Sequence, residues 1–329
     1  MNISILGSGG WGTANAILLT GIGHHVTLWS RSADTARRIS ETRKNTTYLP
    51  NATIPESVHV TASPAEAMDG ADAVVLAVPS RFLAETCRAF SGLMKPDTLT
   101  VSLTKGFCEK SHRRMSELAG DILGTRHVVV LSGPTHAEEV ALGIPTAIVA
   151  AAADIDDART VQSAWNCHTF RVYTSNDPVG VETGGAVKNI IAIAVGCSDG
   201  LGFGDNTRAA LITRGLAEMS RFAVACGANP QTMSGLSGMG DLIVTCTSGH
   251  SRNRAVGERL GRGEPIDAIL SSMKMVAEGV WNAHVVREMA ESLGVDMPIT
   301  NAVYGMCHGN LPVSKAISSL MNRPLKGES

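Results

Sequence analysis

The sequence predicts an α/β domain followed by an all-helical domain. In the first half of the chain, short apolar and β-branched runs alternate with helical segments, which is typical of a largely parallel sheet buried on both faces. Beyond about residue 178 these runs stop and the chain reads as helices. We therefore expect one domain over residues 1–178 and a second over 179–329, a division that suits a chain of 329 residues.

Individual elements follow from the same patterns. Strands are predicted at 2–6, 25–29, 73–78, 98–103, 128–132, 146–150 and 169–173. In the second domain, helices are predicted at 207–227, 251–261 and 278–294.

Composition narrows the class of protein. Hydrophobic residues make up 44% and charged residues 18%, and the net charge of -2 gives no reason to expect a nucleic-acid or anionic-membrane partner. The seven cysteines are scattered without a C-x-x-C pair, which favours reduced thiols in a cytoplasm and predicts no metal site. No basic leader pattern opens the chain and no apolar run reaches about 18 residues, so we expect neither a signal peptide nor a membrane span.

The first predicted strand ends in "GSGGWG", where Gly7, Gly9 and Gly12 fit G-x-G-x-x-G. The first glycine permits a tight turn, the second lets backbone approach a pyrophosphate, and the third lets helix and strand pack closely. A strand precedes the motif and a helical pattern follows it, so the sequence predicts a Rossmann-type dinucleotide-binding domain. A glycine-rich turn without a ligand is the alternative.

The end of the second strand bears on which dinucleotide binds. NAD-selective sites usually place an acid there, whereas this chain has Ser30 and Arg31. Arg31 is suited to a 2′-phosphate, which favours NADPH and leaves NADH possible. A solvated surface arginine is the alternative.

Polar residues follow three further strands. They are "AVPS" (77–80), Lys105 in "SLTKG", and "SGPTHAEE" (132–139), in which Thr135 and Glu138 have capping-box spacing. Lys105 is a candidate anion-binding residue, although a surface lysine would read the same. The capping box is equally consistent with a purely structural role.

The helical half contains a lysine in an unusual place. Lys188 lies in "ETGGAVKNIIAIAVG", an almost wholly apolar segment where an unpaired cation is costly. Asp241, which follows two glycines in "SGMGDLIVTC", is a candidate partner. A structural lysine–aspartate pair is the alternative to a catalytic one.

A second cluster, "SGHSRNRAVG", places Ser251 at a predicted helix N-cap and Arg252, Asn253 and Arg254 in the first turn. Arginines there oppose the helix dipole unless they hold an anion, so the segment predicts a phosphate site. An exposed arginine patch is the alternative. Glu278, in "KMVAEGV", reads equally well as an ordinary helix-start glutamate.

Together these segments resemble the bacterial NAD(P)-dependent glycerol-3-phosphate dehydrogenases over essentially the whole chain. The resemblance rests on "GSGGWGTA", "SLTKGF", "LSGPTHAEEV", "GGAVKNIIAIAVGCSDGLGFGDNTRAALITRGLAEM", "GMGDLIVTCTSGHSRNRAVG" and "PITNAVY". It implies a Rossmann-type domain followed by a helical domain, a homodimer, and interconversion of dihydroxyacetone phosphate and sn-glycerol 3-phosphate for phospholipid synthesis.

The resemblance also implies roles for individual residues. Lys188 would be the proton donor and acceptor beside Asp241, and Lys105 would lie between cofactor and substrate. Cofactor contacts would come from Gly7, Gly9, Gly10, Trp11, Gly12, Arg31, Lys105, Ala137, Arg252, Val276 and Glu278. Substrate contacts would come from Lys105, Gly133, Thr135, Lys188, Asp241, Ser251, Arg252 and Asn253. Gly10 stands where alanine or serine is common, and the residue at position 31 varies within the family.

Such a lysine suits the reaction, because hydride addition to a ketone leaves an alkoxide that needs a proton or a cation. Two other readings remain. One is a related reductase acting on a β-hydroxyacid or ketopantoate, which the basic cluster argues against. The other is a non-catalytic dinucleotide sensor, which the Lys188–Asp241 pair argues against.

Overall fold

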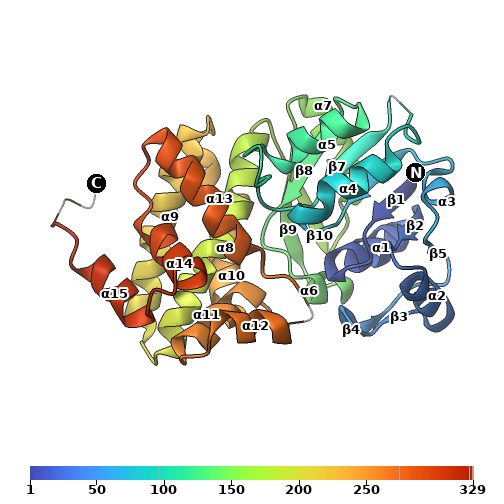
Figure 1. Cartoon of the computed structure of the whole chain (residues 1–329). Helices are drawn as coiled ribbons and strands as arrows, with labels where there is room; N and C mark the ends of the chain where they lie inside the picture. The colour runs from blue at the N-terminus through green and yellow to red at the C-terminus, as the bar shows by residue number, and fades with distance from the viewer. Residues whose placement is uncertain (96, 274, 326, 328–329) are drawn as a thin grey trace.

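The computed structural model describes residues 1–95, 97–273, 275–325 and 327. An α/β domain and an all-helical domain lie side by side, with the N-terminus in the first and the C-terminus at the far end of the second (Figure 1). The fold class expected from the sequence is confirmed. The sheet ends at Ser175 and the first helix of the helical domain begins at Pro178.

An eight-stranded sheet forms the centre of the first domain. In order across the sheet its strands are β10 (Phe170–Ser175), β9 (Thr146–Ala151), β8 (Val128–Ser132), β7 (Leu99–Ser102), β6 (Ala73–Leu76), β1 (Asn2–Leu6), β2 (His25–Trp29) and β5 (His59–Thr61). All neighbours are parallel except β8 and β9, which are antiparallel. The seven predicted strands are all present, and β5 is an additional edge strand of three residues.

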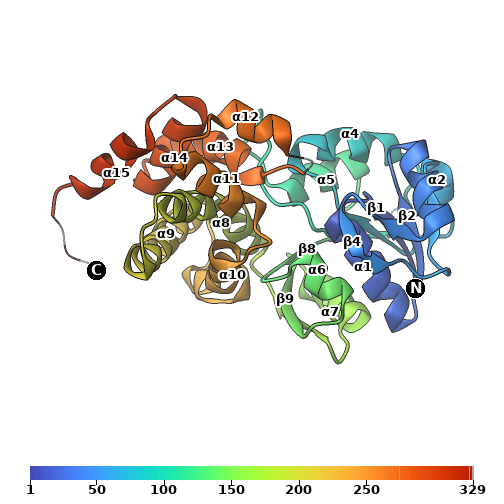
Figure 2. The ribbon, with the colours of Figure 1, turned by 90° about the horizontal axis from the view of Figure 1, so that it is seen from below.

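Helices cover both faces of this sheet. Alternate side chains of each strand point to opposite faces, so Ile5 packs on one side and Leu6 on the other. The first face packs against α1 (Gly10–Ile22), α6 (Ala137–Ala141) and α7 (Ile155–Trp165), and the second against α3 (Pro64–Met68), α4 (Ser80–Phe90) and α5 (Met115–Leu123). A helix α2 (Ala33–Thr42) packs against β5, and a small antiparallel ribbon of β3 (Lys44–Asn45) and β4 (Leu49–Thr53) places β4 beside α1 and α6 (Figure 2).

The helical domain is built around α8 (Pro178–Gly200), whose side chains are buried on every side. The elements that surround it are α9 (Asp205–Ala225), η1 (Pro230–Ser234), the π-helical turn η2 (Leu236–Gly240), α10 (Asp241–Thr247), α11 (Arg252–Gly261), α12 (Ile266–Ser272), α13 (Glu278–Leu293), α14 (Pro298–His308) and α15 (Val313–Met321). Among the described residues, only α8 is long and apolar enough to cross a membrane, and 94% of its apolar window is buried inside the protein. It is therefore the core helix of this domain.

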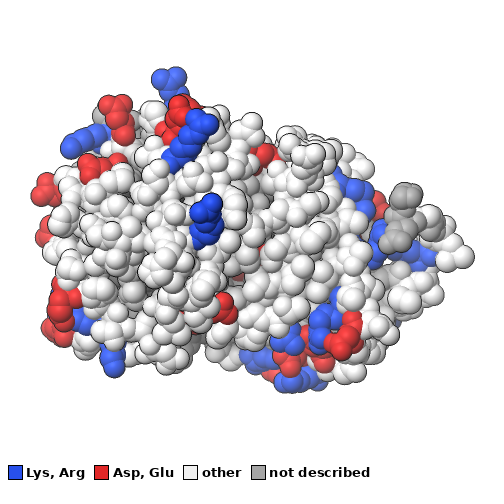
Figure 3. All heavy atoms as spheres, turned by 180° about the vertical axis from the view of Figure 1, so that it is seen from behind, with Lys and Arg blue, Asp and Glu red and all other residues white. Residues whose placement is uncertain are grey.

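Charge is spread thinly over the surface. On the face shown in Figure 3, lysines and arginines lie near aspartates and glutamates around the edges, and most of the centre is uncharged. No continuous basic stripe crosses that face.

Candidate active site

The glycine loop between β1 and α1 has the form that a dinucleotide requires. Gly7 has φ +123°, and a Cβ there would lie 2.5 Å from the carbonyl oxygen of Ala77. A Cβ on Gly12 would lie 2.0 Å from the oxygen of Gly7, so these two glycines are fixed by packing. A Cβ on Gly9 would meet nothing within 4 Å, which leaves the backbone open to a ligand at the N-terminus of α1.

Two other elements border this loop. A Cβ on Gly10 would lie 3.0 Å from the oxygen of Tyr48 and 3.8 Å from the Cβ of Ala137, the first residue of α6. Trp11 packs partly buried against the domain core. The structure thus brings together the predicted cofactor residues Gly10, Trp11 and Ala137.

Arg31 follows β2 directly and is exposed. Its guanidinium carbon lies 5.0 Å from the ring centroid of Phe82, a residue in the first turn of α4. The predicted 2′-phosphate residue is therefore held by an aromatic ring at the carboxyl end of the sheet.

Lys188 lies in the middle of α8 and is only 6% exposed. Its Nζ donates to a carboxylate oxygen of Asp241 and, over 2.7 Å, to the hydroxyl of Thr245. Lys105, in the loop after β7, donates to the other oxygen of Asp241 over 2.8 Å. Asp241 is the first residue of α10 and follows the π-helical turn η2, a departure from α-helical geometry that is frequent at functional sites. One buried carboxylate therefore holds two lysines, one from each domain.

This arrangement lowers the pKa values of both Lys188 and Asp241. Burial lowers the pKa of Lys188 to about 7; the Asp241 carboxylate opposes that change and the nearby Lys105 ammonium adds to it. Burial alone would raise the pKa of Asp241, but the two ammonium groups outweigh it and hold that pKa below its usual range. A lysine with a pKa near neutrality beside an ionised aspartate can both give and accept a proton.

The N-terminus of α11 lies next to this cluster. Ser251 is the N-cap and its hydroxyl accepts from the backbone N–H of Arg254, as the sequence predicted. The side chain of Asn253 is hydrogen-bonded at both its nitrogen and its oxygen: it donates to Asn189 over 2.9 Å and accepts from the N–H of Gly279 over 2.9 Å. Since Asn189 follows Lys188 in α8, this network ties the helix N-terminus to the catalytic candidate.

The arginines of this cluster have different surroundings. Arg254 forms an ion pair with Asp199 at 2.7 Å. Arg252 is exposed and donates to the carbonyl oxygen of Val276 over 2.9 Å. Only Arg252 is therefore placed to meet a ligand at the helix N-terminus.

Glu278, the first residue of α13, connects the two domains. Its carboxylate accepts from the backbone N–H of Ser80 over 3.2 Å and from the Ser80 hydroxyl over 2.8 Å. Burial raises the pKa of Glu278, although the Ser80 hydrogen bonds and the Arg252 charge oppose this. Because Ser80 opens α4, this contact brings α13 against the carboxyl end of β6.

The predicted capping box is wrong. The N-cap of α6 is His136, and the hydroxyl of Thr135 donates to the oxygen of Gly133 over 3.2 Å instead of accepting from the N–H of Glu138. The helix therefore begins one residue later than the spacing predicts. Gly133 packs closely on β9, where a Cβ would lie 3.1 Å from the Cα of Ile148.

Sequence reasoning missed Thr245, Asn189 and Phe82, and it pointed to Ser80 without its partner. Thr245 lies four residues after Asp241, a helical spacing that was visible in the sequence, and Asn189 follows Lys188 directly. Ser80 and Phe82 lie in the predicted "AVPS" segment or just after it, but nothing local indicated their partners Glu278 and Arg31.

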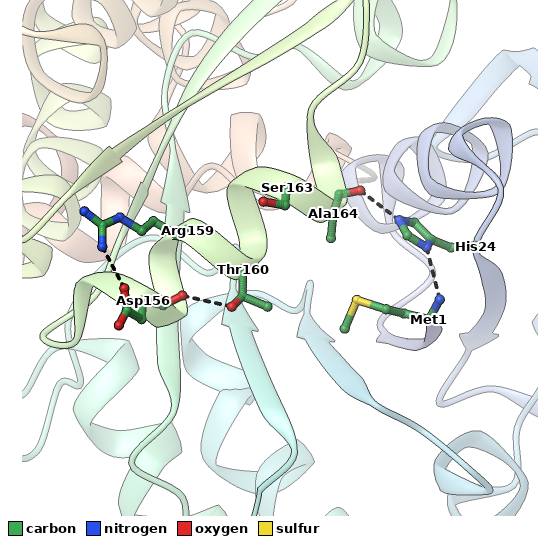
Figure 4. A pocket seen from close by; sticks show the side chains of 7 residues that line it. All are labelled: Met1, His24, Asp156, Arg159, Thr160, Ser163 and Ala164. Carbon is green, nitrogen blue, oxygen red and sulfur yellow. Dashed lines mark hydrogen bonds and ion pairs between the residues drawn. The ribbon is translucent and has the colours of Figure 1, made fainter.

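Two cavities lie away from this site. One of about 560 Å³ is bordered by Met1, His24, Asp156 and Arg159 at the amino end of β1, the edge of the sheet opposite the glycine loop (Figure 4). Another of about 400 Å³ lies between α8, α9, α14 and α15. Neither contains Lys188 or the glycine loop.

A dinucleotide-binding sheet facing a helical domain across a buried lysine–aspartate pair defines a two-domain, nicotinamide-dependent oxidoreductase. The chain belongs to the NAD-dependent glycerol-3-phosphate dehydrogenase family. The model of that family's N-terminus matches residues 2–158, and the model of its C-terminus matches residues 177–318.

Individual relatives support the same family assignment. The chain is 50% identical to a glycerol-3-phosphate dehydrogenase [NAD(P)+] of Chlorobium phaeobacteroides, covering 100% of this chain and 99% of the relative, and 48% identical to one of Geobacillus thermodenitrificans, covering 99% and 96%. It superposes on the crystal structure of glycerol-3-phosphate dehydrogenase from Coxiella burnetii with a TM-score of 0.94 at 37% identity, covering 98% and 99% of the chains. A ketopantoate reductase from Ralstonia eutropha reaches a TM-score of 0.62 at 16% identity, covering 96% of this chain and 100% of the reductase, and shares the fold alone.

Proposed function

We infer that the chain catalyses the reversible NAD(P)H-dependent reduction of dihydroxyacetone phosphate to sn-glycerol 3-phosphate. Its family membership identifies the reaction. The mechanism is inferred from one observation: Lys188, Asp241 and Lys105 form a cluster beside the N-terminus of α11. The bound nicotinamide supplies or accepts the hydride.

We propose that Lys188 moves the proton. During reduction its Nζ donates to the oxygen of the former carbonyl group, and in the reverse direction the neutral amine accepts that proton. Asp241 and Thr245 hold Nζ in place, and Lys105 adds positive charge where negative charge develops.

We propose that the substrate phosphate binds at the N-terminus of α11. The first N–H groups of a helix have no partner within the helix, so those of Arg252 and Asn253 are available to an anion. The guanidinium of Arg252 adds a charge-assisted bond, and Ser251 shapes the turn. Since the side chain of Asn253 is engaged within the protein, its contribution comes from the backbone.

The remaining assignments are also proposals. Gly7, Gly9, Gly10, Trp11, Gly12 and Ala137 border the pyrophosphate, Val276 and Glu278 close over the cofactor with Arg252, and Gly133 and Thr135 line the substrate pocket. Arg31 favours NADPH over NADH, because a guanidinium pairs with a 2′-phosphate. Following the family resemblance, we also propose that the protein is a cytoplasmic homodimer. Light scattering should then give twice the chain mass of 34.4 kDa, and a monomeric mass would reject the dimer.

Loss of NADPH absorbance in the presence of dihydroxyacetone phosphate tests the reaction. The Arg252→Ala variant tests the phosphate site, because a truncated charge pair typically costs about 2–5 kcal/mol, or roughly 30-fold and upward in kcat/KM. Dihydroxyacetone, which lacks the phosphate, should respond little, and added phosphite dianion should activate the wild type far more than the variant. Equal losses on both substrates would reject the phosphate role of Arg252.

Arg31→Asp tests cofactor choice. Losing a charge-assisted pair is worth about 1.5–3 kcal/mol, so the ratio of kcat/KM for NADPH to that for NADH should fall about tenfold or more. An unchanged ratio would make Arg31 an ordinary surface residue.

A further inference from the structure

Two arginines meet at one aromatic ring beside the nucleotide loop. The guanidinium carbon of Arg31 lies 5.0 Å from the ring centroid of Phe82, and that of Arg81 lies 4.6 Å from the same centroid. Arg31 follows β2 and Arg81 lies in the first turn of α4, after β6. Because β2 and β6 are the two neighbours of β1, both arginines flank the loop that contains Gly9.

Within the part of the chain that the structure describes, neither guanidinium forms an ion pair, although the charge of Arg81 is near enough to oppose the rise in the pKa of Glu278. Over its first 113 residues, the arginines that form ion pairs are Arg37, Arg43 and Arg113. Asp34, the acid nearest to Arg31 in sequence, is paired with Arg37 at 3.2 Å. Two like charges near one ring repel each other, and a bound dianion would relieve that repulsion.

The helical domain also holds Arg81 in this position. Its guanidinium carbon lies 5.8 Å from the ring centroid of Trp281 in α13. Trp281 is three residues after Glu278, which anchors α13 to Ser80, the neighbour of Arg81. Arg81 is therefore confined between a ring of its own domain and a ring of the other.

We propose that Arg81 is a second specificity-determining arginine, which binds the 2′-phosphate of NADPH together with Arg31. A phosphate monoester carries close to two negative charges and three free oxygens, so it can accept hydrogen bonds from two guanidinium groups at once. This inference rests on the proposed preference for NADPH and extends it to a residue of α4.

Calorimetric binding of two nucleotides tests the proposal without turnover. Adenosine 2′,5′-bisphosphate carries the 2′-phosphate, and adenosine 5′-phosphate lacks it. In Arg81→Ala, the affinity for the bisphosphate should fall about tenfold or more, as expected for a lost charge-assisted pair, while the affinity for adenosine 5′-phosphate should stay near that of the wild type. Arg88→Ala is the matched control, because Arg88 is an exposed arginine of the same helix that should affect neither ligand.

The outcomes separate this inference from the one on which it rests. If Arg31→Ala weakens the bisphosphate selectively and Arg81→Ala does not, the role of Arg81 is rejected and the NADPH preference stands. If the wild type binds both nucleotides equally and neither arginine matters, both proposals are rejected. A loss in Arg81→Ala that is equal for the two nucleotides would also overturn the proposal, since it would indicate a general disturbance of the adenosine site.

Discussion

Lys188 is buried in an apolar helix, yet its ammonium group has two hydrogen-bond partners there, Asp241 and Thr245. Burial lowers its pKa to about 7, and Asp241 keeps a charged form accessible despite that burial. A lysine with its ordinary pKa would hold its proton throughout the neutral range and would be a poor base for the reverse reaction.

The two reaction directions should therefore have opposite pH profiles. Reduction needs the protonated lysine, so its kcat should fall as pH rises through about 7, the pKa of Lys188. Oxidation needs the neutral amine, so its kcat should rise through the same region. Profiles of kcat in both directions at saturating substrates would measure this, and a reduction rate that is flat from pH 6 to pH 9 would contradict it.

Removing the Asp241 charge should move that inflection. Asp241→Asn keeps the shape of the side chain but removes the carboxylate that raises the pKa of Lys188. The inflection of the reduction profile should shift to lower pH, and kcat should fall because Nζ loses a partner. A purely structural aspartate would lower stability or kcat and leave the inflection where it is.

At this scale the sequence predicted the buried lysine and its aspartate partner but not the rest of their surroundings. A lysine within an apolar segment is conspicuous because an unpaired buried charge is costly, and Asp241 followed as a candidate partner. The pairing of Lys105 with the same carboxylate depends on the contact between domains, which no local pattern encodes.

At the scale of elements, glycines set the position of α11, the helix whose N-terminus is the proposed phosphate site. A Cβ on Gly196 of α8 would lie 2.0 Å from the oxygen of Arg254, and a Cβ on Gly257 of α11 would lie 2.0 Å from the oxygen of Ile193. Gly200 and Gly261 repeat the pattern one turn later. The two helices therefore touch backbone to backbone, and this contact holds the N-terminus of α11 beside Lys188.

Gly257→Ala should disrupt this contact. The added methyl group meets a backbone carbonyl that cannot move aside, so we expect a loss of about 1–3 kcal/mol or more and a higher KM for dihydroxyacetone phosphate. Gly21→Ala in α1 is the matched control, since a Cβ there meets nothing within 4 Å and should stabilise by about 0.5–1 kcal/mol. Chemical denaturation of both variants measures this, and similar unfolding free energies would contradict the packing argument.

Long apolar strands could be predicted from the sequence, whereas short or context-dependent elements could not. The edge strand β5 has three residues and too little pattern to stand out. The antiparallel pairing of β8 and β9 depends on the short connection through α6. The paired glycines of α8 and α11 were visible at helical spacing, but a glycine alone does not show which backbone approaches it.

At the scale of the molecule, the domains are joined by polar contacts of unequal strength. Glu182 of α8 is buried and accepts from Arg114 over 2.7 Å and from the N–H of Ser116 over 2.9 Å. A second contact, between His112 and Glu288 at 3.2 Å, is exposed on both sides.

These two contacts predict different costs. Glu182→Ala leaves the backbone N–H of Ser116 without a partner and Arg114 with Glu117 as its remaining carboxylate, so it should destabilise the protein by about 1–3 kcal/mol. Glu288→Ala, which removes an exposed pair between the same two domains, should cost no more than about 1 kcal/mol. Urea unfolding followed by circular dichroism gives the free energy of unfolding of both variants. An equal loss in the two would show that burial does not determine how strongly a contact between the domains stabilises the protein.

The two-domain architecture could be predicted because strands and helices segregate along the chain. The contacts between the domains could not, since they join residues far apart in sequence, such as Ser80 and Glu278. The family resemblance supplied the site residues that local physics left open.

The most direct test of the mechanism is the turnover of Lys188→Ala with NADPH and dihydroxyacetone phosphate, measured beside its affinity for NADPH. The proposed role predicts that kcat falls by roughly 10²–10⁴, as expected for loss of a general acid, while NADPH affinity stays close to normal because the glycine loop is unchanged. Lys188→Met, which fills more of the cavity, should show the same loss if the alanine variant does not fold. Near-normal turnover in either folded variant would contradict the assignment of Lys188 as the proton donor.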